Sequence, residues 1–158
     1  MGPEEERLWE TARAQIESGE LNRAAALLEG LRRKAPEFAA PQKELAKVYT
    51  GLDRYDRALR VGRDYSKLAP DDTDWLFELA RMAVRIGDDR EAARFADRVR
   101  LRDPKHVEAL TILMEANVRL GRPDRAARLV NRILYVEPKH AGALKLRDTL
   151  APADQESF

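Results

Sequence analysis

Two histidines are the residues of this 158-residue chain whose type and spacing could do chemistry. His106 ends the stretch RDPKH and His140 ends VEPKH, 34 residues later, and the chain holds no other histidine. A matched pair could ligate a metal ion or include a catalytic base. It could also belong to a segment that the chain repeats. The spacing alone leaves both interpretations open.

Other chemistry-bearing patterns are sparse. Asp71-Asp72 and Asp88-Asp89 are carboxylate pairs, but each stands just before an expected helix, where acidic side chains cap the first turn. The sequence motifs of phosphate-binding loops, zinc proteases and nucleophile elbows are absent. There is no cysteine, which excludes disulfides and thiolate chemistry. We therefore expect no enzyme activity, no metal and no cofactor.

Composition narrows the class of partner. The chain has 29 basic and 28 acidic side chains, and this balance argues against a generic nucleic-acid binder. No apolar run approaches the ~18 residues of a membrane span, and the acidic start MGPEEERLWE is unlike a secretion signal. We expect a soluble protein, cytoplasmic or, if the chain is cut from a longer exported protein, periplasmic.

A 34-residue period organises the chain. Four residue types keep it: proline at 36, 70, 104 and 138, alanine at 24, 58, 92 and 126, glycine at 19, 87 and 121, and leucine at 45, 79 and 113. A long period shared by several residue types is typical of a repeat architecture. His106 and His140 are then equivalent linker residues. Equivalent atoms of stacked helices lie ~8–10 Å apart, which is too far for one shared metal ion.

Each repeat is expected to be a pair of helices. In the third, DTDWLFELARMAVRIG predicts the first helix, with Asp72 or Thr73 as its N-cap, and Gly87 closes it in a left-handed conformation. DDREAARFADRVRLRD predicts the second helix, which Pro104 ends. Small residues should meet where the two helices cross: Ala80 with Ala92, Ala12 with Ala24, and Ala46 with Ala58.

These residues resemble the tetratricopeptide repeat family, whose 34-residue helix–turn–helix pattern they follow. The resemblance implies an all-α, right-handed α-solenoid forming one domain over residues 1–150. Its four repeats would span 5–38, 39–72, 73–106 and 107–140, with a capping helix at 141–150 and a disordered tail at 151–158. The chain departs from the pattern at Thr11, at Asp53 where glycine is usual, and at Met114 where a small residue is expected.

The resemblance also implies a non-enzymatic scaffold that holds a partner protein or peptide in a concave groove lined by the first helices. The residues in register on that face are Trp9, Arg13, Lys43, Lys47, Phe77, Arg81, Val84 and Arg85. Their basic and aromatic character favours a partner segment with acidic and apolar residues. The alternative, that these side chains are merely solvated, stays open. The chaperone-binding class of the family is not expected, because asparagine is missing where its carboxylate clamp would need it.

The second helices carry arginines of their own, Arg60, Arg94 and Arg128, each 34 residues from the next. They are either ion-paired surface residues or a secondary patch on the convex face for an acidic partner or anionic lipid headgroups. A self-assembling structural module, and hence a homo-oligomer, is a further alternative. The resemblance allows a role in a bacterial envelope assembly such as polysaccharide export. The sequence does not identify the partner.

Overall fold

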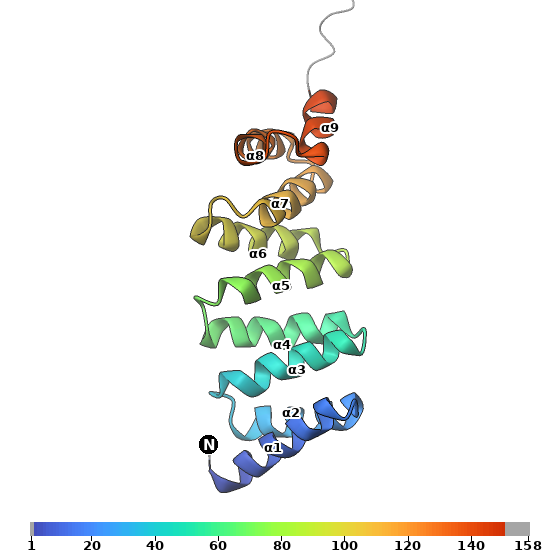
Figure 1. Ribbon diagram of the computed structural model, residues 1–158, viewed down its shortest axis with the longest axis vertical. Coiled ribbons are helices and arrows are strands. Elements are labelled where there is room, and N and C mark those ends of the chain that lie inside the picture. The colour runs from blue at the N-terminus through green and yellow to red at the C-terminus, as the bar shows by residue number, and fades with distance from the viewer. Residues whose placement is uncertain (1, 151–158) are drawn as a thin grey trace, which may run out of the picture. The chain divides into compact units, whose positions relative to one another are not determined.

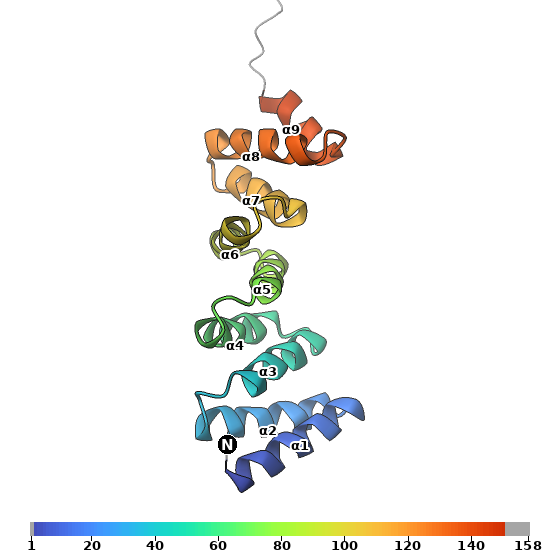
Figure 2. The same cartoon turned by 60° about the vertical axis from the view of Figure 1, so that its left-hand side comes forward.

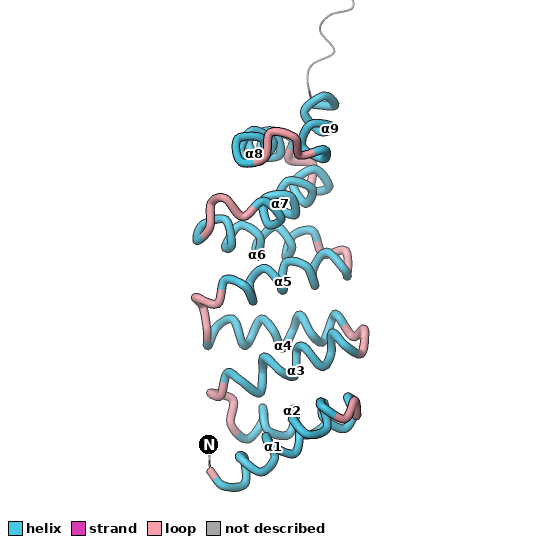
Figure 3. The backbone as a smooth tube through the Cα atoms, viewed as in Figure 1, coloured by secondary structure: helices cyan, strands magenta, loops and turns pink. Residues whose placement is uncertain are grey.

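The computed structural model describes residues 2–150, and within them the chain forms nine helices and no strand (Figure 1, Figure 3). The expected all-α repeat fold is confirmed. The tail predicted at 151–158 lies outside the described residues. No helix in the described part of the chain is both long and apolar enough to cross a membrane. The helices form two compact units, Met1–Trp75 and Leu76–Phe158, and the boundary falls inside one helix, α5.

Unit 1 holds two complete helix pairs. Its helices are α1 (Pro3–Glu17), α2 (Leu21–Lys34), α3 (Ala39–Gly51), α4 (Tyr55–Leu68) and the first residues of α5 (Thr73–Arg85). Consecutive helices pack on one another, α1 on α2, α2 on α3 and α3 on α4. Neighbours in sequence are therefore neighbours in space throughout this unit, as expected for helical repeats.

Unit 2 continues the same pattern. It contains the rest of α5, then α6 (Asp89–Arg102), α7 (Val107–Arg119), α8 (Pro123–Val136) and α9 (Ala141–Leu150), which follow one another in Figure 2. Helix α6 packs on α7, α7 on α8, and α8 on α9. Helix α9 has the bounds expected of the capping helix. Whether the two units act as one continuous array stays a prediction.

The residues expected at the helix crossings are the most deeply buried in the molecule. Within unit 1, Ala12, Ala24, Ala46 and Ala58 are 0% exposed, and within unit 2 the same holds for Ala80 and Ala92. A methyl side chain at these positions lets paired helix backbones approach closely, and a larger one would overpack the site. Larger apolar residues, Leu28, Leu45, Phe95, Leu110 and Ile133, are equally buried. The core of each unit is therefore continuous from pair to pair.

A left-handed residue ends the first helix of every pair. Gly19, Gly87 and Gly121 have φ values of 79°, 73° and 67°, and Asp53 takes the equivalent place with φ 56°. After α5, the N–H of Asp88 donates to the carbonyl of Ala83 (2.9 Å), and the N–H of Gly87 donates to that of Val84 (3.1 Å). These are the two hydrogen bonds of a Schellman motif. The role expected of Gly87 is confirmed, and Asp53 shows that aspartate can fill the position.

We predict that one substitution, glycine to alanine, has opposite effects at two sites. Gly87→Ala should lower the free energy of unfolding by about 1 kcal/mol, because alanine is strained at positive φ. Gly30→Ala, inside α2, should raise it by about 0.5–1 kcal/mol, because the added methyl meets no atom within 4 Å and restricts the unfolded chain. Urea titrations followed by circular dichroism would measure both. Equal effects would contradict the assigned turn geometry.

Candidate functional site

The two matched histidines cap helices. Nδ1 of His106 accepts the N–H of Ala109 (3.3 Å) at the start of α7, and Nδ1 of His140 accepts the N–H of Ala143 (3.1 Å) at the start of α9. Each ring satisfies a backbone donor that the helix leaves open. Among the described residues, no three His, Cys, Asp or Glu side chains are grouped to hold a metal ion. The linker position was predicted, but the capping role was missed.

The carboxylate pairs also serve helix starts. Asp72 Oδ1 accepts the N–H of Trp75 (3.0 Å), and Asp88 Oδ1 accepts the N–H of Glu91 (3.0 Å). The expected capping role is confirmed for both. Asp89, beside the second cap, pairs with Arg119 Nε at 2.6 Å. Asp72, Asp88 and Asp89 each have a structural partner, and these contacts account for both carboxylate pairs without a catalytic role.

Lys43, predicted as a groove residue, is engaged inside unit 1. Its ammonium lies 2.6 Å from Asp72 Oδ2, and the Tyr65 hydroxyl donates to the same oxygen (2.7 Å). The ammonium is also 5.3 Å from the ring centroid of Tyr65 and 5.6 Å from the ring of Trp75. Trp75 in turn donates its indole N–H to Gly62 O at 3.1 Å. This lysine cluster ties α3 and α4 to the start of α5.

Ionisation follows from these contacts. The hydrogen bond to Asp72 raises the pKa of Lys43, although partial burial opposes it. Burial alone would raise the pKa of Asp72, but hydrogen bonds from Lys43, Tyr65 and the Trp75 backbone lower it below its usual value. Burial and the neighbouring Asp72 carboxylate raise the pKa of Tyr65. The ion pair is therefore stable in its charged form.

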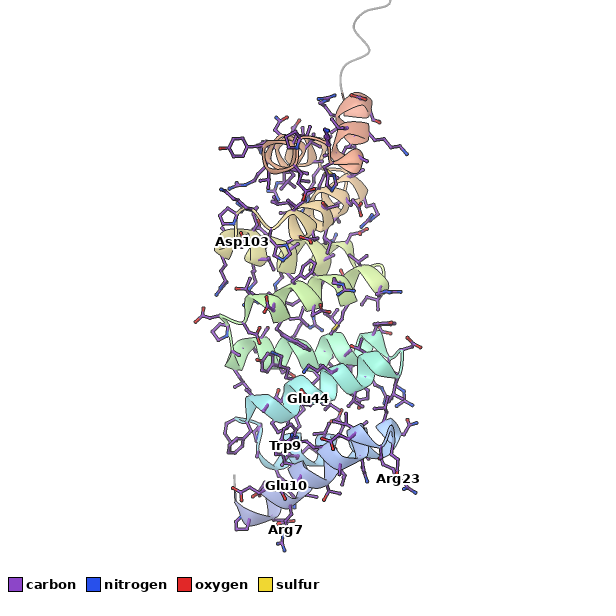
Figure 4. The ribbon with its side chains drawn as sticks, in the orientation of Figure 1. Arg7, Trp9, Glu10, Arg23, Glu44 and Asp103 are labelled. Atoms are coloured by element: carbon purple, nitrogen blue, oxygen red, sulfur yellow. The ribbon has the colours of Figure 1, made fainter. Side chains whose placement is uncertain are left out.

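The other predicted residues of unit 1 lie on its surface. Trp9 is half-buried on α1, while Arg13 on α1 and Lys47 on α3 are exposed. Lys47 pairs with Glu44 at 2.7 Å, and both Trp9 and Glu44 are labelled in Figure 4. An exposed pair of this kind contributes little to stability. Lys47 is thus available to a partner, and its alignment with Arg81 of unit 2 stays a prediction.

Unit 2 brings two predicted residues into one cleft. Phe77 and Arg81 of α5 line a cleft of about 600 Å³ together with Val107, Glu108, Thr111 and Ile112 of α7 and with Glu137 and His140 from the α8–α9 turn. We call it the first-helix cleft. Val84 is 39% exposed, and Arg85 is exposed; both lie outside this lining. Glu137 and His140 were missed, because they belong to the turn that closes the fourth repeat and not to a first helix.

Contacts within the first-helix cleft fix its walls. The rings of Phe77 and His106 lie 4.6 Å apart between centroids. Thr111 Oγ1 lies 3.2 Å from His140 Nε2 and donates to the carbonyl of Val107 (2.9 Å). Because His140 Nδ1 accepts a backbone N–H, Nε2 of the neutral ring carries the proton and donates to Thr111. Arg81 pairs with Glu78 one turn away (3.0 Å), and its side chain is 56% exposed.

The predicted secondary patch divides between the units. Arg94 and Arg128 line a cleft of about 640 Å³ between α6 and α8, over Leu113 and Asn117 of α7. We call it the arginine cleft. Arg60 is exposed on α4 of unit 1. The structure thus brings two of the three arginines together within one unit.

Comparison with known proteins supports the repeat assignment. A family model described as "Tetratricopeptide repeat" matches residues 15–76. The solved structure "Crystal structure of MamA protein" is 14% identical and has a TM-score of 0.73, covering 95% of this chain and 87% of that chain. YrrB, described as "a TPR protein with an unusual peptide-binding site", is 18% identical with a TM-score of 0.72, covering 88% and 72%.

A tetratricopeptide repeat protein from Parabacteroides merdae is 21% identical with a TM-score of 0.72, covering 94% of this chain and 59% of that one. At these identities the likeness shows the fold alone. No match was found among curated proteins.

We predict that Asp72→Asn lowers the free energy of unfolding by about 2 kcal/mol at pH 7, because it weakens the ion pair and a helix cap. The lowered pKa of Asp72 means that its contribution is present above the ordinary carboxyl pKa, near ~4, and is lost as pH falls through the lower, folded value. The difference between wild type and variant should therefore shrink from pH 5 downward.

Thermal unfolding at a series of pH values would measure this difference. The exposed Asp74→Asn, also in the first turn of α5, is the matched control and should change stability only slightly. A difference between wild type and Asp72→Asn that stays constant from pH 7 to pH 2 would contradict the assigned ionisation.

Proposed function

Since the chain belongs to the tetratricopeptide repeat family, whose fold is a protein–protein interaction scaffold, we propose that it holds an extended segment of a partner protein in the first-helix cleft. The observation that carries this proposal is the joining of Phe77 and Arg81, both expected to bind a partner, in one cleft of about 600 Å³. Proteins with these repeats are typically non-catalytic, and the proposed role requires no chemistry.

The lining suggests what the partner segment contains. Phe77, Val107 and Ile112 offer apolar surface for a side chain of the segment, and Arg81 can pair with an acidic residue. Glu108 and Glu137 line the same cleft with the opposite charge. We therefore propose a segment with apolar and acidic residues, in line with the sequence analysis. A basic residue of the segment would pair with Glu108 or Glu137.

The side chains that line the first-helix cleft are already held in place, which favours peptide binding. Thr111 and His140 are linked to each other and to backbone atoms, so their side chains lose little freedom when a peptide binds. The peptide-binding site ascribed to YrrB, a structure of the same fold, supports a peptide as the ligand class. We include the exposed Arg13 and Lys47 of unit 1 as additional contacts for the partner.

The setting of this function is part of the proposal. We infer that the protein serves a multi-protein assembly, and a bacterial envelope assembly such as polysaccharide export is the setting that the family resemblance allows. Two clefts on unit 2, the first-helix cleft and the arginine cleft, support a role in which one chain contacts more than one partner.

We predict that Phe77→Ala/Arg81→Glu weakens capture of the partner from the source organism's lysate by about tenfold or more, because it removes an apolar wall and reverses the nearby charge. The comparison uses the immobilised wild-type and variant chains. Arg60→Glu, a charge reversal at an exposed residue of a second helix, is the matched control and should retain the partner.

A photo-crosslinking residue in place of Arg81 would locate the contact directly. It should join the same partner that the wild-type chain captures, whereas a crosslinker in place of Arg60 should not. Equal capture by wild type and the double variant, together with crosslinking from position 60 alone, would overturn the proposed site.

A further inference from the structure

Equivalent positions in the two units differ where the arginine cleft lies. In unit 1, Tyr49 of α3 is 4% exposed, its hydroxyl donates to Glu29 of α2 (2.8 Å), and the guanidinium of Arg57 of α4 lies 5.8 Å from its ring. Tyr49 therefore occupies part of the space between α2 and α4, and a cleft of about 540 Å³ lies farther along these helices beside Arg32 and Asp64. Two repeats later the same position holds Asn117, which is 3% exposed and smaller. The cleft between α6 and α8 in unit 2 lies over this asparagine.

Seven arginines line this cleft with only one carboxylate, Asp97. Helix α6 contributes Arg90, Arg94 and Arg100, and the start and body of α8 contribute Arg122, Arg125, Arg128 and Arg132. Two have acidic partners on α6 itself: Arg100 pairs with Asp97 (2.7 Å) and Arg94 with Glu91 (2.9 Å). The remaining charge gives the cleft a strongly positive potential.

Unit 1 shows that the fold does not require this charge. The positions equivalent to Arg90, Arg94 and Arg132 hold Asn22, Ala26 and Asp64. There Asp64 pairs with Arg32 at 2.5 Å, so that face carries less net positive charge than the arginine cleft. The same helical scaffold is thus built with three fewer cations and one more carboxylate. The other four cleft arginines have arginine at the equivalent positions of unit 1, so Arg90, Arg94 and Arg132 are what unit 2 adds.

The positions of these arginines are unfavourable for two electrostatic reasons, the helix dipole and repulsion between like charges. Arg90 and Arg125 lie in the first turns of α6 and α8, where the helix dipole favours acidic side chains. On α6, beside the cleft lining, burial and the neighbouring Arg102 and Arg94 lower the pKa of Arg98. Repulsion among crowded positive charges is relieved when an anion binds.

The cleft floor identifies the kind of anion. Asn117 Nδ2 donates to Leu113 O (2.7 Å), while its Oδ1 has no hydrogen-bond partner within residues 2–150. A buried acceptor without a donor is costly, and a backbone N–H of a ligand would satisfy it once the Asn117 amide turns toward the cleft. Ala93, Leu113 and Leu129 complete an apolar floor. A ligand that fits has carboxylates, N–H donors and apolar side chains.

We propose that the arginine cleft is a second docking site, for an acidic segment of a partner protein. A peptide offers carboxylates to the arginines, N–H groups to Asn117 and side chains to the floor. Phosphate chains and anionic lipid headgroups offer mainly acceptors, which leave Asn117 unsatisfied. Leu101 and Tyr135, 65% and 82% exposed, lie two turns beyond Arg94 and Arg128 on the same helix faces and extend the apolar surface.

The test uses a fluorescein-labelled ten-residue peptide of glutamate and leucine, with binding followed by fluorescence anisotropy. Wild type should bind it, and binding should weaken as salt rises. Arg128→Asp should weaken binding about tenfold or more, and Asn117→Tyr, which installs the residue of unit 1, should do the same by filling the cleft. Arg60→Asp reverses the equivalent charge in unit 1 and should bind like wild type.

Further arms separate the outcomes. The glutamate–leucine peptide also suits the first-helix cleft, so the Arg128→Asp comparison is repeated in the Phe77→Ala/Arg81→Glu background, where that cleft is altered. Arg128→Asp should cause the same fold loss of binding there, so failure of one site is distinguished from failure of the other. Arg128→Asp alters an exposed side chain and keeps the test decisive if Asn117→Tyr fails to fold by circular dichroism. Absence of peptide binding, equal binding by Arg128→Asp, or tighter binding of polyphosphate or phosphatidylserine vesicles than of the peptide would overturn the proposal.

Discussion

The close approach of paired helices at buried alanines is the constraint on which the rest of the structure depends. Ala46 and Ala58 in unit 1 and Ala80 and Ala92 in unit 2 are 0% exposed. A larger side chain at such a position would separate the two backbones and disturb the packing of the next pair. Because the constraint occupies few positions in each repeat, the remaining helix faces can vary. The two clefts of unit 2 lie on faces that vary in this way.

The 34-residue period predicted much of this structure because its strongest signals are local. Helix ends, the left-handed Gly87 and the caps at Asp72 and Asp88 depend on residues a few positions apart. The apolar contacts at the helix crossings were predicted, but polar contacts between helices were not. Lys43 meets Asp72 and Tyr65 from later elements, and its expected role toward a partner stays a prediction. His140 was expected only in a linker, and its capping role depends on the direction of one ring nitrogen.

Residues that depart from the repeat pattern have different structural effects in the two units. Asp53 replaces a glycine and keeps the left-handed turn, so this change leaves the scaffold as it is. The change from Tyr49 to Asn117 at equivalent positions accompanies a cleft and a gathering of arginines. The aspartate at position 53 preserves backbone geometry and is explained by the repeat alone. The asparagine at position 117 accompanies a cleft lined by arginines, and this difference is the basis of the proposed docking site.

If a partner binds the variable faces of unit 2, hydrogen–deuterium exchange will locate it there. Exchange would be compared between the chain alone and its complex with the partner captured from lysate. We expect slower exchange in α5, α7 and the α8–α9 turn, around the first-helix cleft, with α2 and α4 unchanged. Protection confined to unit 1, or none in unit 2, would contradict this expectation.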